Sequence, residues 1–378
     1  MEWKEVRLGD ILNFRRGHDL PHSAMKPGNI PVAGSNGVIG YHDTATPIKP
    51  ILTIGRSGNV GKPYFYEEAW AHNTTLYVDD FKGNDPKFLY YLCQTMPFAN
   101  FGGGSAVPTL NRNHIHPLET KIPVKVEDQR RIASILSSLD RKIELNNKIN
   151  ADLEKMAQAI FKNWFVDFEP FKDGKFVDSE LGMIPEGWKV GWLTDVIKLM
   201  PGGTPKTSEP LYWDNGTIPF FSPKDVNGVY CFATEKHITE AGLNKCSSNL
   251  YPKDTIFITC RGTVGKVCLA ACDMAMNQSN YAIKAIDGYS QYYVFFLVKS
   301  VVERLIKKSN GAVFSAITSK DFDEEILIPS QKAVEDFTNV IDGFFRRIFT
   351  IGTENSRLST LRDTLLPRLM SGEIEVPE

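Results

Sequence analysis

The sequence contains no run of about 18 apolar residues, the length that a membrane-spanning helix needs. Its first residues, MEWKEVRLGD, lack the apolar centre of a signal peptide. Cysteine is scarce: the six cysteines form no CxxC pair and lie mostly in apolar or strand-like runs, so we expect buried reduced thiols. These absences favour a cytoplasmic protein without membrane contact.

An excess of one charge is also missing, because 43 Lys and Arg residues stand against 45 Asp and Glu residues. The chain as a whole is not basic, so binding to nucleic acid would need a local basic face. With 378 residues, the chain is long enough for two domains that each bury a core.

Sequence landmarks of the first half recur in the second half. Trp3-Lys4 recurs as Trp188-Lys189, and His72-Asn73-Thr74 corresponds to Met276-Asn277-Gln278. The segment ILTIGRSGNVGK recurs as IFITCRGTVGK, which pairs Arg56 with Arg261 and Lys62 with Lys266. The pairs Arg56/Arg261 and Gly104/Gly311 are separated by 205 and 207 residues. A nearly constant offset over many landmarks predicts an internal duplication.

Each copy is followed by a segment that predicts a long helix. Residues 126–168 contain no Gly or Pro, and about 40 residues at about 1.5 Å each would form a rod of some 60 Å. Apolar residues recur at steps of three and four, which is typical of a coiled-coil seam. The seam positions are Ile132, Ile135, Leu139, Asn146, Ile149, Leu153, Met156 and Ile160.

The second helix is expected over residues 331–370, with a kink or fray near Gly352. We predict that it packs antiparallel on the first helix and that Asn146 fixes the register of the pair. Its apolar stripe consists of Val334, Phe337, Val340, Ile341, Phe344, Ile348, Ile351, Leu358, Leu361, Leu365 and Leu369.

Short strand-like runs and helical candidates at 86–96 and 291–307 alternate irregularly, which predicts an α+β fold. The expected order is a first globular domain (1–125), a spacer helix (126–168), a linker (169–187), a second globular domain (188–330), and a C-terminal spacer helix with its tail (331–378).

The loops GNVGK and GTVGK do not match a nucleotide-binding phosphate loop, which needs four residues between its glycines and Ser or Thr after the lysine. Two interpretations remain. The loop is a tight glycine turn whose Arg and Lys face solvent, or these cations contact phosphates or a guanine edge. His114 and His116 would share one face of a strand, but no nearby cysteine completes a metal site, and we expect none.

Residues that can contact bases or phosphates gather in the loops of both copies. No catalytic constellation repeats with them, so we expect a non-catalytic protein. For any single Asn or Ser, a role in capping or turning the chain is an equally good interpretation. The DNA-binding candidates are Arg15, Arg16, Ser35, Asn36, Arg56, Lys62, Asn73, Thr74, Arg112, Asn113, Lys206, Ser222, Lys224, Arg261, Lys266, Asn277, Gln278, Ser279 and Thr318.

The combination of these motifs in this order resembles the specificity subunit of type I restriction–modification enzymes. VAGSNGVIGYHD, TIGRSGNVGK and AHNTTLYV are similar to one target-recognition domain type, and PGGTPKTSEPLYWDNGTIPFFSPKDV, ITCRGTVGK and MNQSNYAI to another. QRRIASILSSLDRKIELNNKINADLEKMAQAIFKNWFVDFEPF resembles the central spacer helix of the family, and GMIPEGWK resembles its entry into the second domain. The start of the chain close to the first domain favours a direct repeat over a permuted one.

The resemblance implies that each globular domain recognises one half of a bipartite, asymmetric site in double-stranded DNA, while the helices set the spacer. It also implies two modification (methyltransferase) subunits and restriction (translocase and nuclease) subunits as partners. S-adenosylmethionine, ATP and Mg²⁺ would bind to those partners, and no cofactor or metal is expected on this chain. Lys142, Asn163, Trp164 and Phe165 are our candidates for partner contact. The competing hypotheses are a scaffold that binds only proteins and, far behind it, a phosphotransferase.

Overall fold

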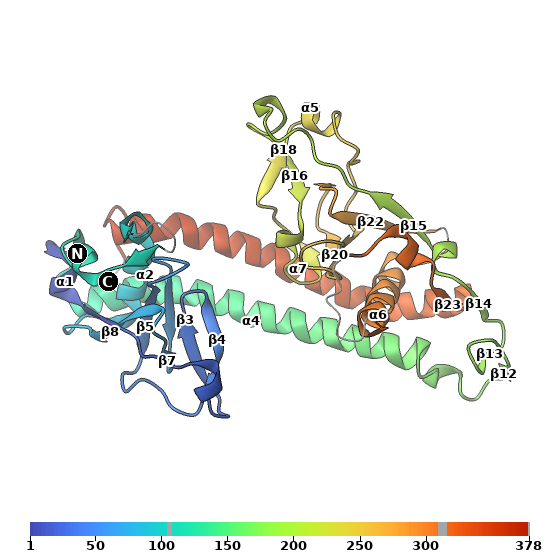
Figure 1. The fold of residues 1–378 in the computed structure, drawn as a ribbon, viewed down its shortest axis with the longest axis horizontal. Coiled ribbons are helices and arrows are strands. Elements are labelled where there is room, and N and C mark those ends of the chain that lie inside the picture. Colours follow the sequence, from blue (N-terminus) through green and yellow to red (C-terminus); the bar gives the residue numbers. More distant parts are fainter. Residues whose placement is uncertain (104–107, 287, 309–315, 377–378) are drawn as a thin grey trace. The chain divides into compact units, whose positions relative to one another are not determined.

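The computed structural model of the chain describes residues 1–103, 108–286, 288–308 and 316–376. It divides into two compact units: unit 1 comprises Met1–Ile143 with Leu358–Glu378, and unit 2 comprises Glu144–Arg357. Both units mix strands and helices, which confirms the α+β fold (Figure 1). The landmark pair Gly104/Gly311 lies outside the described residues. Within the described part, no helix is long and apolar enough to cross a membrane.

Within its described residues, unit 1 contains two sheets of three and four strands and two smaller strand pairs. The strand orders are β2-β8-β5-β6, β4-β3-β7, β1-β11 and β10-β9, and the pairs are antiparallel except β3 with β7. The strands are β1 (Trp3–Arg7), β2 (Asn13–Arg16), β3 (Ile30–Gly34), β4 (Gly37–His42), β5 (Ile51–Gly55), β6 (Pro63–Tyr66), β7 (Trp70–Ala71), β8 (Thr75–Asp80), β9 (Gly102–Gly103), β10 (Thr109–Leu110) and β11 (Glu119–Pro123). Its short helices are α1 (Leu8–Ile11), η1 (His22–Ala24), α2 (Pro86–Thr95), η2 (Phe98–Phe101) and α3 (Arg112–Ile115).

Unit 2 has a similar arrangement, in which the larger sheet contains one strand more. Its strand orders are β15-β22-β19-β20-β17, β18-β16-β21, β14-β23 and β12-β13. The strands are β12 (Phe176–Val177), β13 (Ile184–Pro185), β14 (Lys189–Trp192), β15 (Ile197–Pro201), β16 (Ile218–Phe221), β17 (Tyr230–Cys231), β18 (Lys236–Ile238), β19 (Ile256–Thr259), β20 (Val267–Ala270), β21 (Ala275–Met276), β22 (Asn280–Ala285) and β23 (Glu325–Ile328). The helices are η3 (Glu169–Phe171), η4 (Leu193–Asp195), η5 (Pro210–Tyr212), η6 (Pro223–Asp225), α5 (Glu240–Leu243), α6 (Gln291–Lys308) and η7 (Ser319–Phe322).

The duplication predicted from the sequence therefore extends to strand order and register. The order of neighbouring strands is β2-β8-β5-β6 in the larger sheet of unit 1, and β15-β22-β19-β20 are neighbours in the same way in unit 2. One close approach is repeated as well: a Cβ on Gly17 would lie 2.1 Å from the carbonyl oxygen of His72, and a Cβ on Gly202 would lie 2.1 Å from that of Asn277. Only glycine fits these two positions, because a backbone contact of that length excludes any side chain.

Two long helices, α4 (Val126–Phe165) and α7 (Gln331–Met370), contribute to both units. In unit 1, Arg362 donates to Asp140 over 2.9 Å. In unit 2, Asn146 donates to Asn355 over 2.8 Å, and Asn150 donates to the carbonyl of Ile348 over 3.4 Å. Numbers rise along α4 as they fall along α7, so the helices pair antiparallel as predicted.

The details of the seam differ from the sequence expectation. Met156 is 53% exposed, Val340 and Leu361 are each 47% exposed, and Leu136, Ala157 and Phe345 are buried in their place. An α-helix has 3.6 residues per turn, so the buried stripe drifts away from a strict heptad pattern. Helix α4 also ends at Phe165, three residues early, and Phe168 adopts the left-handed conformation at φ 56°.

Helix α7 runs through Gly352 without a break, so the helix does not fray there. Gly352 has a packing role instead, because a Cβ on it would lie 2.1 Å from the ring of Phe232. The segment predicted as a linker is also folded, since it contains the β12–β13 pair and buries Ile184.

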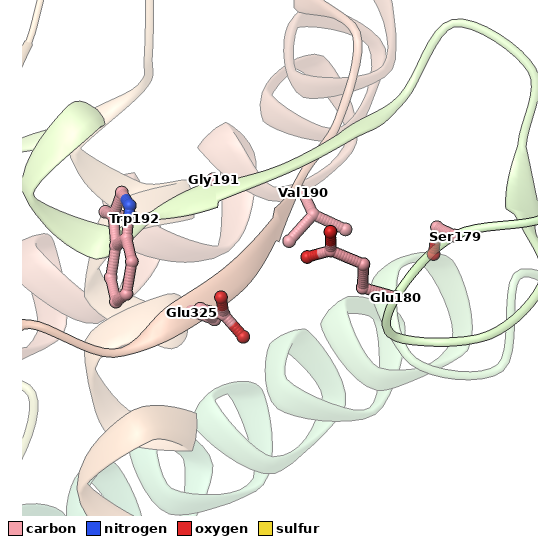
Figure 2. A pocket seen from close by; sticks show the side chains of 6 residues that line it. All are labelled: Ser179, Glu180, Val190, Gly191, Trp192 and Glu325. Atoms are coloured by element: carbon pink, nitrogen blue, oxygen red, sulfur yellow. The ribbon is translucent and has the colours of Figure 1, made fainter.

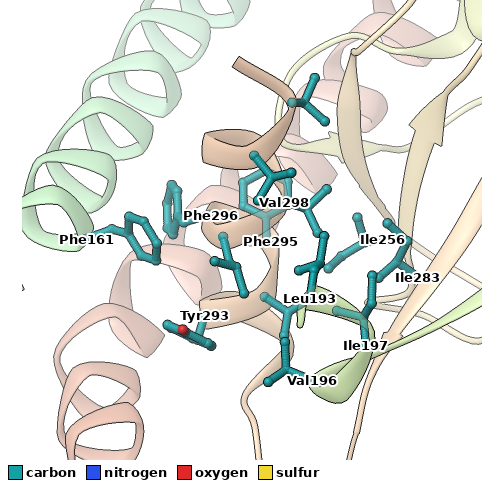
Figure 3. Close-up of a cluster of buried hydrophobic side chains, with 14 of the residues drawn as sticks. Phe161, Leu193, Val196, Ile197, Ile256, Ile283, Tyr293, Phe295, Phe296 and Val298 are labelled. Carbon is teal, nitrogen blue, oxygen red and sulfur yellow. The ribbon is translucent and has the colours of Figure 1, made fainter. Parts of the chain in front are cut away.

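The core of unit 2 forms where α6 packs between the sheet and α4. Figure 3 shows Phe296 and Tyr293 of α6 beside Phe161 of α4, with Ile256 and Ile283 of the sheet on the other side. The core of unit 1 gathers around α2 and includes Ile132 and Leu136 of α4. Helix α2 begins at Pro86, and the Asp85 carboxylate accepts from the Phe88 amide over 2.8 Å, an N-cap that sets the start of the helix.

Candidate nucleic-acid interface

The two glycine loops have the same backbone conformation. The amide of Gly55 donates to the carbonyl of Lys62 over 3.0 Å, and Thr259 donates to Lys266 over 2.9 Å. Gly58 and Gly61 have φ of 84° and 82°, and Gly262 and Gly265 have φ of 80° and 84°. The amides of Gly61 and Gly265 bond back to Gly55 and Thr259 over 2.7 and 2.8 Å. Because the loops use these amides internally, they lack the open amide cradle of a phosphate loop.

The structure corrects the pairing of Arg56 with Arg261. The amide of Arg56 donates to Thr74, whereas in unit 2 the amide of Cys260 donates to Ser279, each over 2.8 Å. Ser57 forms an isolated bridge with Thr109, and Arg261 forms the equivalent bridge with Ala316. Cys260 is thus the counterpart of Arg56, and Arg261 is the counterpart of Ser57. Matching the arginines by letter placed a gap inside loops that have equal length.

The turns that precede β8 and β22 lie beside these loops and hold their polar side chains in the same way. The side-chain amide of Asn73 donates to Asp19, and Gln278 accepts from the hydroxyl of Thr204. His72 is therefore equivalent to Asn277, not to Met276 as the sequence pairing predicted. Asp19 and Thr204 were not among the predicted site residues, although each lies two residues after its glycine, Gly17 or Gly202, and that equal distance is their signal in the sequence.

Other candidates in these turns have internal partners. Asn277 accepts from the amide of Ser279 over 3.0 Å and from Asn280 over 2.6 Å. In unit 1, the hydroxyl of Thr74 lies 2.9 Å from Nδ1 of His72. These side chains shape the turn, which agrees with the capping interpretation.

A third segment, the turn after β3 or β16, completes the cluster. A Cβ on Gly55 would lie 3.2 Å from the carbonyl oxygen of Ser35, and the hydroxyl of Thr263 donates to the carbonyl of Pro223 over 3.3 Å. Asn36 and Lys224 are exposed in these turns. Ser222 donates to Asp225 over 2.7 Å in a capping box, and the exposed Lys224 lies 3.8 Å from Glu235.

We call these three segments together the loop surface of each unit. In unit 1 it consists of residues 35–36, 56–62 and 72–74, and in unit 2 of residues 222–225, 260–266 and 277–279. Lys62, Lys266 and Arg261 are exposed on it, while Arg56 is half-buried and donates to the carbonyl of Asn73 over 3.5 Å. Arg16 joins the surface through Asp19, which it contacts at 3.2 Å.

Five predicted DNA-binding residues take no part in the contacts that join the three segments of a loop surface. Arg15 points away from Arg16, because neighbours on a strand face opposite sides, and lies 3.5 Å from Asp79. Arg112 donates to the carbonyl of Phe14 over 3.2 Å, and Thr318 bonds to Asp321 over 2.7 Å as a helix cap. The exposed residues Asn113 and Lys206 lie in α3 and in the loop after β15.

His114 and His116 do not lie on a strand as predicted. His114 is in α3 and His116 follows its last residue. Nε2 of His116 accepts from the amide of Phe14 over 3.1 Å, and burial lowers the pKa of this imidazole. The part of the chain that the structure describes contains no group of three or more His, Cys, Asp or Glu residues arranged to hold a metal ion.

The candidates for partner contact separate into two groups. Phe165 is 8% exposed and packs against Trp188, Tyr293 and Phe337, so a partner cannot reach it, and that prediction is withdrawn. Trp164 packs beside it against the same core. Lys142 and Asn163 are exposed rather than at core positions of the seam.

Unit 2 also contains an open pocket of about 360 Å³ that is lined by Glu180, Trp192 and Glu325 (Figure 2). Trp192 and Glu325 face each other in the β14–β23 pair, and the indole is 48% exposed. Two carboxylates at this opening would repel DNA phosphates, so the pocket is not part of the candidate interface.

Comparisons with known proteins agree with this arrangement. The model of the type I restriction modification DNA specificity domain matches residues 1–155 and 185–346. The specificity subunit of the type I restriction enzyme MjaIX from Methanocaldococcus jannaschii is 30% identical, over 77% of this chain and 70% of the relative. The HindI specificity subunit from Haemophilus influenzae is 28% identical, over 98% of this chain and 94% of the relative.

The fold is shared with a solved structure. The S subunit of a type I restriction–modification system from M. genitalium has a TM-score of 0.60 at 14% identity, and the match covers 98% of this chain and 96% of that one. The resemblance drawn from the sequence is thereby confirmed, and the competing scaffold and phosphotransferase hypotheses gain no support. The chain belongs to the type I restriction–modification DNA specificity subunits, the non-catalytic family that recognises the DNA sequence for its complex.

Proposed function

We propose that the loop surface of unit 1 recognises one half of a bipartite DNA site and that the loop surface of unit 2 recognises the other half. The observation that carries this proposal is the repetition of one backbone framework with different side chains. Gly55–Lys62 and Thr259–Lys266 share hydrogen bonds and glycine conformations, yet Ser57 in one loop is replaced by Arg261 in the other. Equal frameworks with unequal side chains suit two half-sites of different sequence.

On each surface, different residues would contact the phosphates and the bases of the DNA. Lys62 and Lys266 are exposed at the same loop position, so each would contact a phosphate and fix the position of its unit on the DNA. The side chains of Asn73 and Gln278 are held by Asp19 and Thr204, which orients their remaining polar groups. Asn and Gln pair with adenine through two hydrogen bonds, so they are base-contact candidates.

An exposed face of the helix α4 is a candidate surface for partner binding. Leu145 is 54% exposed and Met156 is 53% exposed on α4, and both lie on the same face as Asn163 at steps typical of a helix stripe. Exposed apolar residues in a helix stripe suit a protein partner. We propose that two modification subunits dock on the helices α4 and α7 and that restriction subunits join the complex. S-adenosylmethionine, ATP and Mg²⁺ would bind to those subunits, and this chain would bind none of them.

The test is to express the chain with an adenine methyltransferase subunit encoded beside it and to map methylated adenines in a random DNA library. We expect one bipartite motif with two different halves and a fixed spacer. Exchange of residues 188–330 for the same segment of a relative should change one half and leave the other. Methylation without a motif, or a change in both halves, would contradict the proposal. A control complex with the docking face changed, Leu145→Glu with Met156→Glu, should lose methylation while the free chain keeps its helical circular dichroism.

A further inference from the structure

The glycine loops carry one outward-facing and one inward-facing position, and the two units fill them differently. We propose that Ser57 in unit 1 and Arg261 in unit 2 occupy the loop position that recognises bases, whereas Arg56 and Cys260 occupy a scaffold position. This inference rests on the proposed function of the loop surfaces, and it assigns DNA recognition to Ser57, which carries no obvious signal in the sequence.

The backbone defines the two positions independently of the side chains. The carbonyls of Arg56 and Cys260 accept from Leu110 and Ile317 over 2.7 and 2.9 Å. Together with the amide bonds of the same two residues, these contacts place Arg56 and Cys260 in one environment. The following residue in each unit, Ser57 or Arg261, forms an isolated bridge, and side chains of adjacent extended residues point to opposite sides.

At the inward position, the side chains are buried or bonded within the protein. Cys260 is 4% exposed, and burial raises the pKa of its thiol to about 12, so the group is neutral and inaccessible to DNA. In unit 1 the same position holds Arg56, which is half-buried and donates from Nη1 to the carbonyl of Asn73 over 3.5 Å. Arg56 thereby links the glycine loop to the turn before β8, so its guanidinium stabilises the loop surface from within.

At the outward position, the side chains form no hydrogen bond or ion pair with the described part of the chain. Arg261 is exposed, and its side chain forms no hydrogen bond or ion pair with the residues that the structure describes. Ser57 is half-buried, as Arg56 is, but its hydroxyl has no hydrogen-bond partner among the described residues. A Cβ on the next residue, Gly58, would lie 3.7 Å from the Ser35 hydroxyl. Ser57 therefore lies near the turn after β3, and Thr263, two residues after Arg261, contacts the turn after β16.

The chemistry of the two side chains then predicts how the half-sites differ. A guanidinium bonds O6 and N7 of guanine through two parallel hydrogen bonds, which is a strongly selective contact. A serine hydroxyl donates or accepts and discriminates less between bases. We therefore expect a guanine in the half-site of unit 2 at the position that Arg261 contacts, and weaker selection at the corresponding position of the half-site of unit 1.

The experiment uses the complete complex with its methyltransferase subunit and the methylation map of a random library. Arg261→Ser should lower discrimination at one base of one half-site by roughly tenfold or more, and Ser57→Arg should create a new preference in the other half only. Arg56→Ala should lower the melting temperature of the chain and the total methylation, while the motif keeps its bases. Arg261→Lys keeps the charge but loses the rigid guanidinium fork, so its guanine preference should be weaker than that of the wild type.

The outcomes separate this inference from the proposed function. If the wild-type complex yields no bipartite motif, the proposed function fails. If the wild type yields a motif but Ser57→Arg and Arg261→Ser leave both halves unchanged, only the inference is overturned. It is also overturned if Arg56→Ala changes the selected bases, or if Arg261→Ser weakens methylation of all sequences equally and leaves the motif unchanged, which would mean a phosphate contact. Ser57→Arg tests the inference in unit 1 even if the Arg261 variants fail to fold.

Discussion

Asn146 of α4 donates from Nδ2 to Oδ1 of Asn355 in α7 over 2.8 Å, inside the seam between the two helices of unit 2. Asn146 is 1% exposed and also donates to Glu354 over 2.8 Å, while Asn355 donates to Asn147 over 2.9 Å. A buried asparagine selects the one helix register in which its amide finds partners. The polar layer therefore fixes how α4 and α7 align in unit 2.

Removal of this amide should weaken the unit measurably. We expect Asn146→Ala to lower the free energy of unfolding by about 1–3 kcal/mol, because it removes a buried donor and leaves the acceptors on Glu354 and Asn355 without that hydrogen bond. Urea unfolding followed by circular dichroism measures the change. Lys148→Ala is the matched control, since Lys148 is exposed on the same helix outside this polar layer and its loss should cost less than about 0.5 kcal/mol. Equal losses in the two variants would contradict a register role for Asn146.

Two glycines of α7 should respond in opposite directions to the same substitution. Gly352→Ala should destabilise the chain by about 1–3 kcal/mol, because the new methyl group would lie 2.1 Å from the ring of Phe232. Gly343→Ala should instead stabilise it by up to about 1 kcal/mol, since no atom lies within 4 Å of that Cβ and alanine favours the helix. Melting temperatures measure both effects.

The double variant Gly352→Ala with Phe232→Ala checks the cause. If the ring of Phe232 is responsible, the loss caused by Gly352→Ala should be smaller in the Phe232→Ala background than in the wild type. Identical losses in the two backgrounds would assign the effect to the helix backbone and refute the packing role.

A phosphate contact has a different signature from a base contact. Lys266 is exposed at the end of its glycine loop, so Lys266→Ala should weaken DNA binding for all sequences and leave the motif unchanged. The slope of log K against log salt should become shallower by about 0.9, the value for one released counterion. Fluorescence anisotropy of the complex at several salt concentrations measures the slope. An unchanged slope would show that Lys266 does not contact a phosphate.

The large features of the fold were predictable because they depend on repetition and periodicity. Two copies, two long helices and an antiparallel pairing follow from landmarks such as Trp3 and Trp188 and from regular apolar steps. Finer features depend on three-dimensional packing. Met156 fits a heptad but is exposed, and Gly352 looks like a helix breaker but makes room for a ring.

The candidate site shows the same division. The glycine loops and the polar turns were found from their sequence, but the equivalence of Ser57 and Arg261 was not. An alignment by residue type pairs Arg56 with Arg261. The backbone hydrogen bonds instead show that Arg56 and Cys260 occupy the same position in the fold. Asp19 and Thr204 were missed because their contacts with Asn73 and Gln278 join segments far apart in the chain, and only their equal distance from Gly17 and Gly202 marks them in the sequence.

Unit 1 should become less stable in acid because of His116. Its Nε2 accepts a hydrogen bond from the Phe14 amide, which requires the neutral ring, and burial, with help from Arg112 and Lys82, lowers its pKa. The unfolded chain then binds the proton more readily than the folded chain. The stabilisation is complete above the unfolded pKa of about 6.5 and is lost as the pH falls through the lower folded value.

Urea unfolding at pH 7 and pH 5 should therefore show a loss of stability in acid that is smaller in His116→Gln, whose amide oxygen can accept the same bond. Burial lowers the pKa of His72 as well, so part of the dependence should remain in that variant. The same acid-induced loss in His116→Gln and in the wild type would contradict the role of His116.

The six cysteines provide a test of burial across both units. Cys93, Cys231, Cys260 and Cys268 are buried, Cys246 is half-buried, and Cys272 is exposed, so the expectation of buried thiols fails for Cys272. All six are free within the described structure. Burial raises the pKa of Cys231 and Cys260 to about 12, which leaves almost no thiolate at neutral pH, and thiolate is the form that reacts.

We therefore expect a maleimide reagent at pH 7 to label Cys272 first and Cys246 more slowly, while the buried thiols react only after unfolding. Partial burial and the neighbouring Asp273 also raise the pKa of Cys272, so its labelling should be slower than that of free cysteine. Intact mass spectrometry over time counts the labels, and Cys272→Ser should remove the first phase. A first phase that persists in Cys272→Ser would mean that another thiol is accessible and that the packing around β17, β19 and β20 opens in the native state, because those strands and their ends hold three of the buried thiols.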